Sequence, residues 1–233
     1  MSAAGVCQAA DQAPKPASTK ASKGAAKAAV DAPAEDEARG GGPDKSGPPP
    51  ASSSPMAELK KSNAALDKVL RKDRPDWSPE AELQRAEVRK VVGSFLDYGE
   101  LARRSLARHW DTLTVKQRQD FVNTLRQLVE RSYLRQMHSS PNYNIKYEKE
   151  EKTGSEASVT ATLNTVSRGK KVVVALDYKM MWKEGHWVVY DVLTDDQSML
   201  ENYRAEFNKI ITKESFDALL NKMKKKLDEK DEE

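Results

Sequence analysis

The first 57 residues of this 233-residue chain contain no Phe, Trp or Tyr, so all 4 Phe, 4 Trp and 7 Tyr lie further on. The same segment holds 8 of the 11 prolines and 16 alanines. Without large apolar side chains, a segment cannot offset the conformational entropy that folding removes. We therefore expect residues 1–57 to be a disordered Ala/Pro/Gly/Ser-rich tail or linker, residues 58–223 to form a single domain, and residues 224–233 to be a charged, frayed C-terminal tail.

Cysteine is nearly absent, and long apolar runs are absent too. The one cysteine, Cys7, excludes an internal disulfide framework and a zinc site built on cysteines. The longest apolar run, Val172 to Leu176, is far too short to cross a bilayer. The 39 basic and 36 acidic residues nearly balance, with a net charge of +3, which gives no electrostatic case for DNA or RNA. We therefore expect no nucleic-acid partner.

The motifs of common enzyme classes are also missing. None of the histidines, His109, His138 and His186, has a second histidine at metal-ligand spacing, and no HExxH motif occurs. The sequence has no Gly-x-Ser-x-Gly elbow and no glycine-rich nucleotide loop. We therefore expect no catalytic residues, no metal and no cofactor, and no enzymatic activity.

The start of the chain leaves the cellular compartment open. Residues 3–10 resemble the small-residue end of a secretory signal that lacks its charged and apolar regions. They are either an ordinary disordered start or the remnant of a signal peptide whose true start lies upstream. A domain without cysteine suits an oxidising compartment and the cytosol equally.

Apolar residues at helical spacing predict helices in the first half of the domain. The first covers residues 58–71, and the next two begin at the caps Ser78 and Asp97. A capping box of Thr114 and Gln117 precedes a long fourth helix. Its apolar stripe contains Phe121, Val122, Leu125, Leu128, Val129 and Tyr133.

The apolar period then changes from 3.6 to 2. Alternation predicts strands around residues 143–147, 159–163, 172–182 and 187–193. Short turns join them, which favours a four-stranded antiparallel meander. Helical spacing returns after Ser198. The order predicts an α+β fold, in which the sheet packs against N-terminal and C-terminal helices.

One carboxylate interrupts the last strand. Asp191 lies in an apolar stretch, and a buried carboxylate needs a partner. Tyr203 and Arg204 are the partners that we consider, so we assign these residues a structural polar role rather than a catalytic one. The pair Asp195 and Asp196 after the same strand is interpreted as a loop that leads to a helix cap.

Two stretches of the domain carry a family resemblance. In the first, Arg108–Trp110 is followed by Thr114-x-x-Gln-x-x-x-Phe121. In the second, Trp187–Val192 is followed by Asn202–Arg204. Together they resemble the MlaC family, also called the toluene-tolerance family, over about residues 58–220. Two positions depart from the family pattern: Ala107 stands where glycine is usual, and residues 193–197 replace an Ile-Glu-Gly-like stretch.

The resemblance implies a soluble periplasmic carrier that binds the acyl chains of a phospholipid in an apolar cavity between the sheet and the helices. The phospholipid is cargo rather than a cofactor. The implied partners are an inner-membrane ABC transporter complex with an MlaD-like, MCE-domain subunit and an outer-membrane lipoprotein complex of the MlaA type. The carrier shuttles lipid between them.

On this reading, the acyl chains lie between the sheet and the long helix. The candidate lining residues are Phe121, Leu125 and Leu128 from that helix, and Val174, Leu176, Tyr178, Met180, Trp187 and Val189 from the strands. Two alternatives stay open from the sequence. One is a binding or adaptor module with a solid core and a basic outer face. The other is a small enzyme on a cone-shaped sheet.

Overall fold

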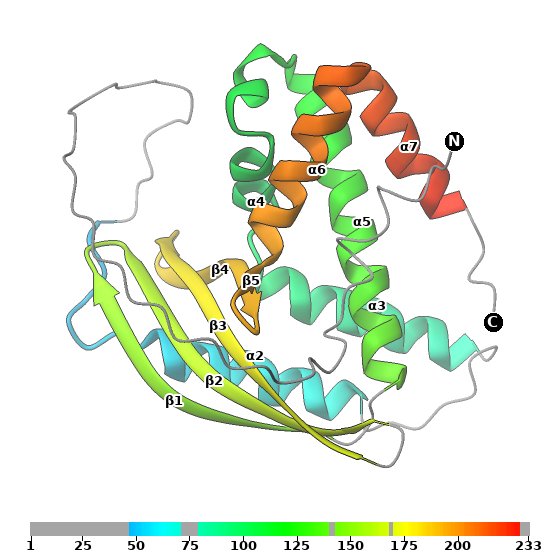
Figure 1. Ribbon diagram of the computed structural model, residues 1–233. Helices are drawn as coiled ribbons and strands as arrows, with labels where there is room; N and C mark the ends of the chain where they lie inside the picture. The colour runs from blue at the N-terminus through cyan, green and yellow to red at the C-terminus, as the bar shows by residue number, and fades with distance from the viewer. Residues whose placement is uncertain (1–46, 71–78, 140–142, 168–169, 229–233) are drawn as a thin grey trace, which may run out of the picture.

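A curved antiparallel sheet lies beside a group of helices (Figure 1). The computed structural model describes residues 47–70, 79–139, 143–167 and 170–228. Helices precede and follow the sheet along the chain, which confirms the α+β class. The predicted cap Ser78 lies outside the described residues.

The sheet is a meander, because every strand pairs with its neighbours in sequence and all pairs are antiparallel. It has one strand more than predicted. Residues 197–198 pair with residues 193–194 at the end of the preceding strand, and two residues are too few to give an alternating pattern. The strands are β1 (Tyr143–Thr153), β2 (Glu156–Ser167), β3 (Lys170–Lys183), β4 (His186–Thr194) and β5 (Gln197–Ser198).

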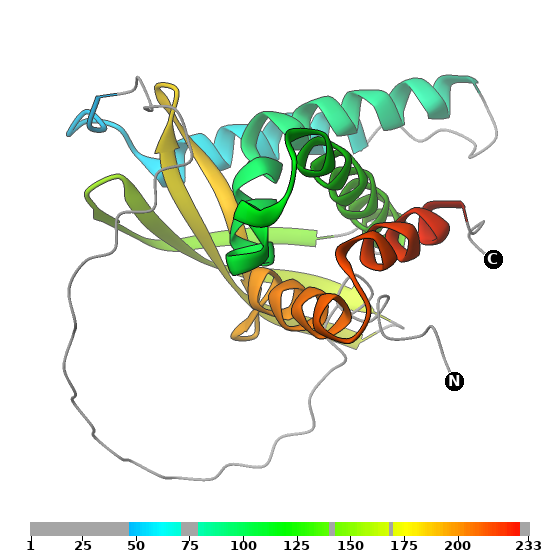
Figure 2. The same cartoon turned by 90° about the horizontal axis from the view of Figure 1, so that it is seen from above.

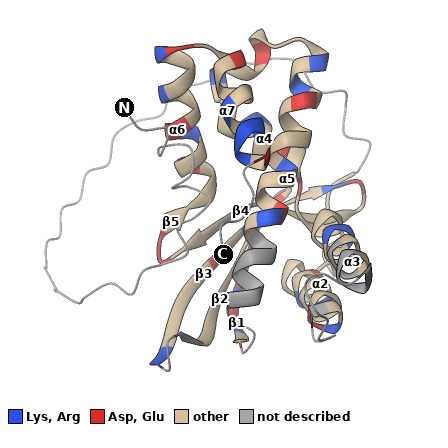
Figure 3. Cartoon of the chain, turned by 90° about the vertical axis from the view of Figure 1, so that its right-hand side faces the viewer, with Lys and Arg blue, Asp and Glu red and all other residues tan. Residues whose placement is uncertain are grey.

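The helices form two groups, seen from two further directions in Figures 2 and 3. Helices α2 and α3 lie side by side, and α2 also contacts β1, β2 and β4. Helices α4, α5, α6 and α7 pack mainly on one another, while α4 and α6 also contact β4. The elements are α2 (Pro55–Leu70), α3 (Pro79–Phe95), α4 (Tyr98–Leu106), the 3-10 helix η2 (Ala107–Thr112), α5 (Val115–Ser139), α6 (Met199–Lys213) and α7 (Phe216–Asp228).

Local hydrogen bonds begin three of these helices where the sequence predicts. The Asp97 carboxylate accepts a hydrogen bond from the backbone N–H of Glu100 at 2.9 Å. Thr114 and Gln117 form the expected capping box, in which each side chain accepts from the other residue's backbone N–H. Ser198 caps α6 by accepting from the N–H of Glu201. These caps satisfy N–H groups that have no partner within the helix.

The packed domain extends past both predicted boundaries. Helix α2 begins at Pro55, and the indole N–H of Trp187 donates to the hydroxyl of Ser53 at 3.1 Å. At the other end, the Arg131 guanidinium donates to the carbonyls of Lys226 and Leu227, so the last turn of α7 is held by a contact rather than frayed. Residues 1–46 and 229–233, which complete the two predicted tails, lie outside the described part.

Candidate functional site

One face of the sheet, which we call the inner face, is apolar and buried. Alternation along β3 separates it from the opposite face: Val174 is 3% exposed, whereas Val173 is 64% exposed. Strand pairing places residues of β2 and β4 beside those of β3. The buried residues of the inner face are Ala157, Val159, Ala161, Val174, Tyr178, Met180, Trp182, Trp187 and Val189.

Helix α2 lies on this inner face. It contacts three of the strands, and its residues Leu59 and Leu66 are almost fully buried. Leu59 and Leu66 are seven residues apart, so they lie on one side of the helix, two turns from each other. The amphipathic pattern of α2 is therefore explained by its position against the sheet.

Polar contacts run between α2 and the edge strand β1. The amide of Asn63 donates a hydrogen bond to the Tyr147 hydroxyl, and the Tyr143 hydroxyl donates to the Asp67 carboxylate. Burial raises the pKa of Tyr147 and that of Tyr178, so both hydroxyls stay protonated at neutral pH. We call Asn63, Asp67, Tyr143 and Tyr147 the polar seam.

The predicted lining residues from the sheet lie on the inner face. Tyr178, Met180, Trp187 and Val189 are buried members of the inner face. Val174 is also buried, and Leu176 is half-buried against the core. The period-2 pattern was sufficient to sort these residues by face.

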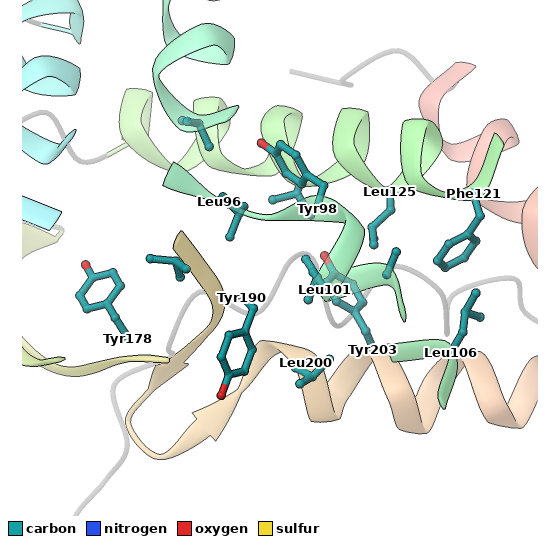
Figure 4. Close-up of a cluster of buried hydrophobic side chains, with 14 of the residues drawn as sticks. Leu96, Tyr98, Leu101, Leu106, Phe121, Leu125, Tyr178, Tyr190, Leu200 and Tyr203 are labelled. Atoms are coloured by element: carbon teal, nitrogen blue, oxygen red, sulfur yellow. The ribbon is translucent and has the colours of Figure 1, made fainter. Parts of the chain in front are cut away.

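The predicted lining residues from α5 lie elsewhere. The Phe121 ring meets the Phe207 ring edge-on at 5.4 Å and the Phe216 ring at 5.9 Å, so it packs between α6 and α7. Leu125 is fully buried in this helical layer, shown in Figure 4, and Leu128 is half-buried beside it. The helix that lies on the inner face is α2 rather than the long helix α5. The apolar stripe of α5 predicted that this helix is packed on one side, but a stripe does not specify which surface it packs against.

The predicted pairing of Asp191 with Tyr203 or Arg204 is wrong. Asp191 is 4% exposed and accepts hydrogen bonds from the Ser198 hydroxyl at 2.6 Å and from the Leu200 N–H at 2.9 Å. The start of a helix offers unpaired N–H groups to a carboxylate, and here α6 begins beside β4.

The other two residues of that prediction have different contacts. The Arg204 guanidinium donates to the Arg104 carbonyl and to the Glu201 carboxylate. The Tyr203 ring stacks on Phe207 at 5.3 Å, which places it in the helical layer. Asp195 and Asp196 form the turn between β4 and β5, each with a positive φ angle, in agreement with a loop.

Sequence reasoning missed a hollow between α3, α4 and α5. Its volume is about 400 Å³. Helical spacing places the residues of each wall on one side of their helix, but the pairing of α3 with α5 cannot be read from that spacing. The hollow is lined by Arg89, Lys90, Gly93, Tyr98, Arg126 and Glu130.

The floor of the hollow is buried and its rim is basic. Glu130 is 8% exposed, and burial raises the pKa of its carboxyl group, although Arg126 and Arg89 oppose that shift. Burial, followed by the neighbouring Glu130 carboxylate, raises the pKa of Tyr98. The Tyr98 hydroxyl is buried and interacts with the Glu130 carboxyl group.

The described residues contain no group of three or more His, Cys, Asp or Glu that could hold a metal ion. Within the same part of the chain, no helix combines the length and the apolar character that a membrane crossing needs. The arrangement offers an apolar layer, a polar seam at its edge and a basic hollow. These features suit the binding of an amphipathic molecule.

Comparisons with known proteins give a family match and a shared fold. The model of the family described as "MlaC protein" matches residues 60–225. The intermembrane phospholipid transport system binding protein MlaC of Haemophilus influenzae is 27% identical over 122 residues, which are 51% of this chain and 56% of that protein. The chain thus matches little more than half the length of that relative.

A solved structure shares the fold. A phospholipid-binding protein from Ralstonia solanacearum, solved in complex with a phospholipid, superposes with a TM-score of 0.64 and 21% sequence identity. The match covers 74% of this chain and 96% of that one. The fold and the family match define the class of protein, an α+β domain with an apolar layer beneath a helix. The chain belongs to the MlaC family.

Proposed function

We propose that this protein is a phospholipid carrier that holds acyl chains against the inner face of its sheet. The observation that carries the proposal is the buried apolar inner face beneath α2, in a chain of the MlaC family. The relative from Haemophilus influenzae is named as part of a phospholipid transport system, and the Ralstonia solanacearum neighbour was solved with a phospholipid.

The physical requirement for such a carrier is an apolar replacement for the bilayer. Transferring two acyl chains with about 30 methylenes in total from a bilayer to water costs roughly 24 kcal/mol of free energy. A protein surface that nearly balances this cost permits both extraction and release. Apolar contact is non-directional, so a surface of Val, Met and aromatic side chains needs no catalytic group.

The proposal includes the place of the protein in a transport route. It works in the periplasm, takes lipid from or delivers it to an inner-membrane ABC transporter complex with an MlaD-like MCE-domain subunit, and exchanges it with an outer-membrane complex containing an MlaA-like lipoprotein. The phospholipid is the cargo, and no enzymatic step is part of the cycle.

Native mass spectrometry of the full chain, purified without detergent from a lipid-containing host, tests the proposal. We expect one phospholipid per protein, and we expect empty protein to take up lipid from vesicles. Protein that is empty as purified and stays empty after incubation with vesicles would contradict the carrier function and favour a binding module with a solid core.

A matched pair of variants on β3 tests where the chains lie. Leu176 is half-buried on the inner face, whereas Val173 is 64% exposed on the opposite face. We expect Leu176→Asp to lose lipid while Val173→Asp keeps it, with circular dichroism confirming that both are folded. Equal lipid content in the two folded variants would place the chains away from the inner face.

A further inference from the structure

The hollow between α3, α4 and α5 has the composition of a phosphate site. Its lining includes three basic side chains, Arg89, Lys90 and Arg126, and one carboxylate, Glu130. Burial raises the pKa of the Glu130 carboxyl group, while Arg126, the Tyr98 hydroxyl and Arg89 oppose that shift, so the three basic side chains outnumber the one carboxyl group in the lining. Arginine and lysine side chains that converge on one place bind phosphate oxygens through charge-assisted hydrogen bonds.

Gly93 keeps this hollow open. A glycine inside a helix costs about 1 kcal/mol of stability relative to alanine. Nothing in the backbone demands glycine here: a Cβ atom built at Gly93 would come no closer than 4.0 Å to its nearest neighbour, the Tyr98 ring. The position has space for a larger side chain, which would extend into the hollow that Gly93 lines.

The hollow adjoins the apolar inner face. Four residues after Gly93, the backbone N–H of Asp97 donates to the Val189 carbonyl at 2.8 Å, and Leu96 bridges to Val189. Val189 is a fully buried member of the inner face. Tyr98, which directly follows Asp97 in the chain, lines the hollow. A short segment of chain therefore connects the basic hollow with the apolar surface.

We infer that the hollow binds the phosphate group of the lipid whose acyl chains lie on the inner face. The inference rests on the proposed carrier function. Phosphate oxygens accept hydrogen bonds from Lys90 and Arg126 at the rim. Because the rim is exposed to solvent, its contribution weakens as salt is added.

The test measures lipid uptake by the full chain from phospholipid vesicles at low ionic strength, read by native mass spectrometry. We expect the double variant Lys90→Gln/Arg126→Gln to bind lipid about tenfold more weakly than the unchanged protein. The control Lys116→Gln/Lys213→Gln removes two exposed charges at the ends of α5 and α6, and we expect unchanged uptake.

A second pair of variants changes volume rather than charge. Gly93→Leu places a bulky side chain in the hollow, so we expect it to lower uptake as the double variant does. Gly93→Ala adds one methyl group that the site accommodates, so we expect normal uptake and a higher melting temperature.

The outcomes separate three possibilities. If the unchanged protein takes up no lipid, the carrier function fails and this inference fails with it. If it takes up lipid and both hollow variants do so equally well, the carrier function stands and the phosphate assignment is wrong. Inorganic phosphate is the last probe: we expect it to slow uptake by the unchanged protein, and phosphate that binds without slowing uptake would identify a site for soluble anions instead.

Discussion

The turn after α4 contains a residue whose backbone conformation suits glycine. Ala107 follows the last residue of α4 with φ 45° and ψ −122°, in a region that side chains with a Cβ atom rarely adopt. Its N–H still donates to the Arg103 carbonyl, so the turn is a genuine helix end. The resemblance to MlaC sequences leads us to expect glycine at this position.

We expect Ala107→Gly to stabilise the protein. Relief of the strained conformation raises the free energy of unfolding by about 1–3 kcal/mol. The greater conformational freedom of glycine in the unfolded chain lowers it by about 0.4–1 kcal/mol. Ala107 is exposed, so loss of its methyl group removes little buried surface. The net gain is about 1 kcal/mol, which corresponds to a rise in Tm of about 2–4 °C for a domain of this size.

Thermal unfolding followed by circular dichroism measures this gain. The matched control is Ala64→Gly, at an exposed position inside α2, where the same substitution costs about 1 kcal/mol. Opposite signs at the two sites support the argument. A fall in Tm for Ala107→Gly that matches the fall at Ala64 would show that no backbone strain is relieved at the end of α4.

Three further predictions concern buried or half-buried carboxylates. Asp191→Ala leaves the Ser198 hydroxyl and the Leu200 N–H without their acceptor, so we expect a loss of about 2–4 kcal/mol in urea unfolding, and a smaller loss for Asp191→Asn, which keeps one acceptor oxygen. Burial raises the pKa of Glu206 to about 7. The ionised carboxylate therefore destabilises the folded protein, an effect that is absent below pH 4.5, the pKa in the unfolded chain, and complete above about pH 7. We expect Glu206→Gln to raise Tm at pH 8 and to leave it unchanged at pH 4.5. Burial opposes ionisation of Glu100, but hydrogen bonds from Arg103 and Arg104 lower the pKa of its carboxyl group to about 2. The ionised carboxylate therefore stabilises the folded protein above pH 4.5, and this stabilisation is lost as the pH falls toward 2. We expect Glu100→Gln to flatten that part of a plot of Tm against pH.

Local chemistry explains what could be predicted from the sequence. The caps Asp97, Thr114 and Ser198 act within three residues of themselves, so their role is visible before the fold is known. The inward face of β3 follows from the period-2 spacing of the large apolar side chains between residues 172 and 182. Both kinds of feature depend on neighbours along the chain.

Features that depend on the pairing of distant elements could not be predicted. The stripe of α5 identifies Phe121 as a core residue, but its partners Phe207 and Phe216 come from helices almost a hundred residues away. Asp191 clearly needed a donor, yet the donor is a helix end created by the fold rather than a side chain of opposite charge. The basic hollow likewise exists only once α3 and α5 lie together.

The same contacts indicate which part of a carrier would have to move. Leu59 and Leu66 of α2 occupy the inner face, so acyl chains can reach it only where these side chains leave it. Exposing both side chains to water costs about 3–6 kcal/mol of free energy. This is far less than the roughly 24 kcal/mol that exposing the acyl chains to water would cost.

The polar seam favours opening at β1, because hydrogen bonds between α2 and β1 can be exchanged for bonds to water at little net cost. The junction of α3 and α4 is held more firmly: Asp97 is bonded to the Val189 carbonyl through its backbone and to Lys183 through its carboxylate at 2.5 Å. Movement of α2 away from β1 would therefore open the inner face and leave the walls of the basic hollow in place. A lipid could then exchange its chains while its phosphate group stays bound.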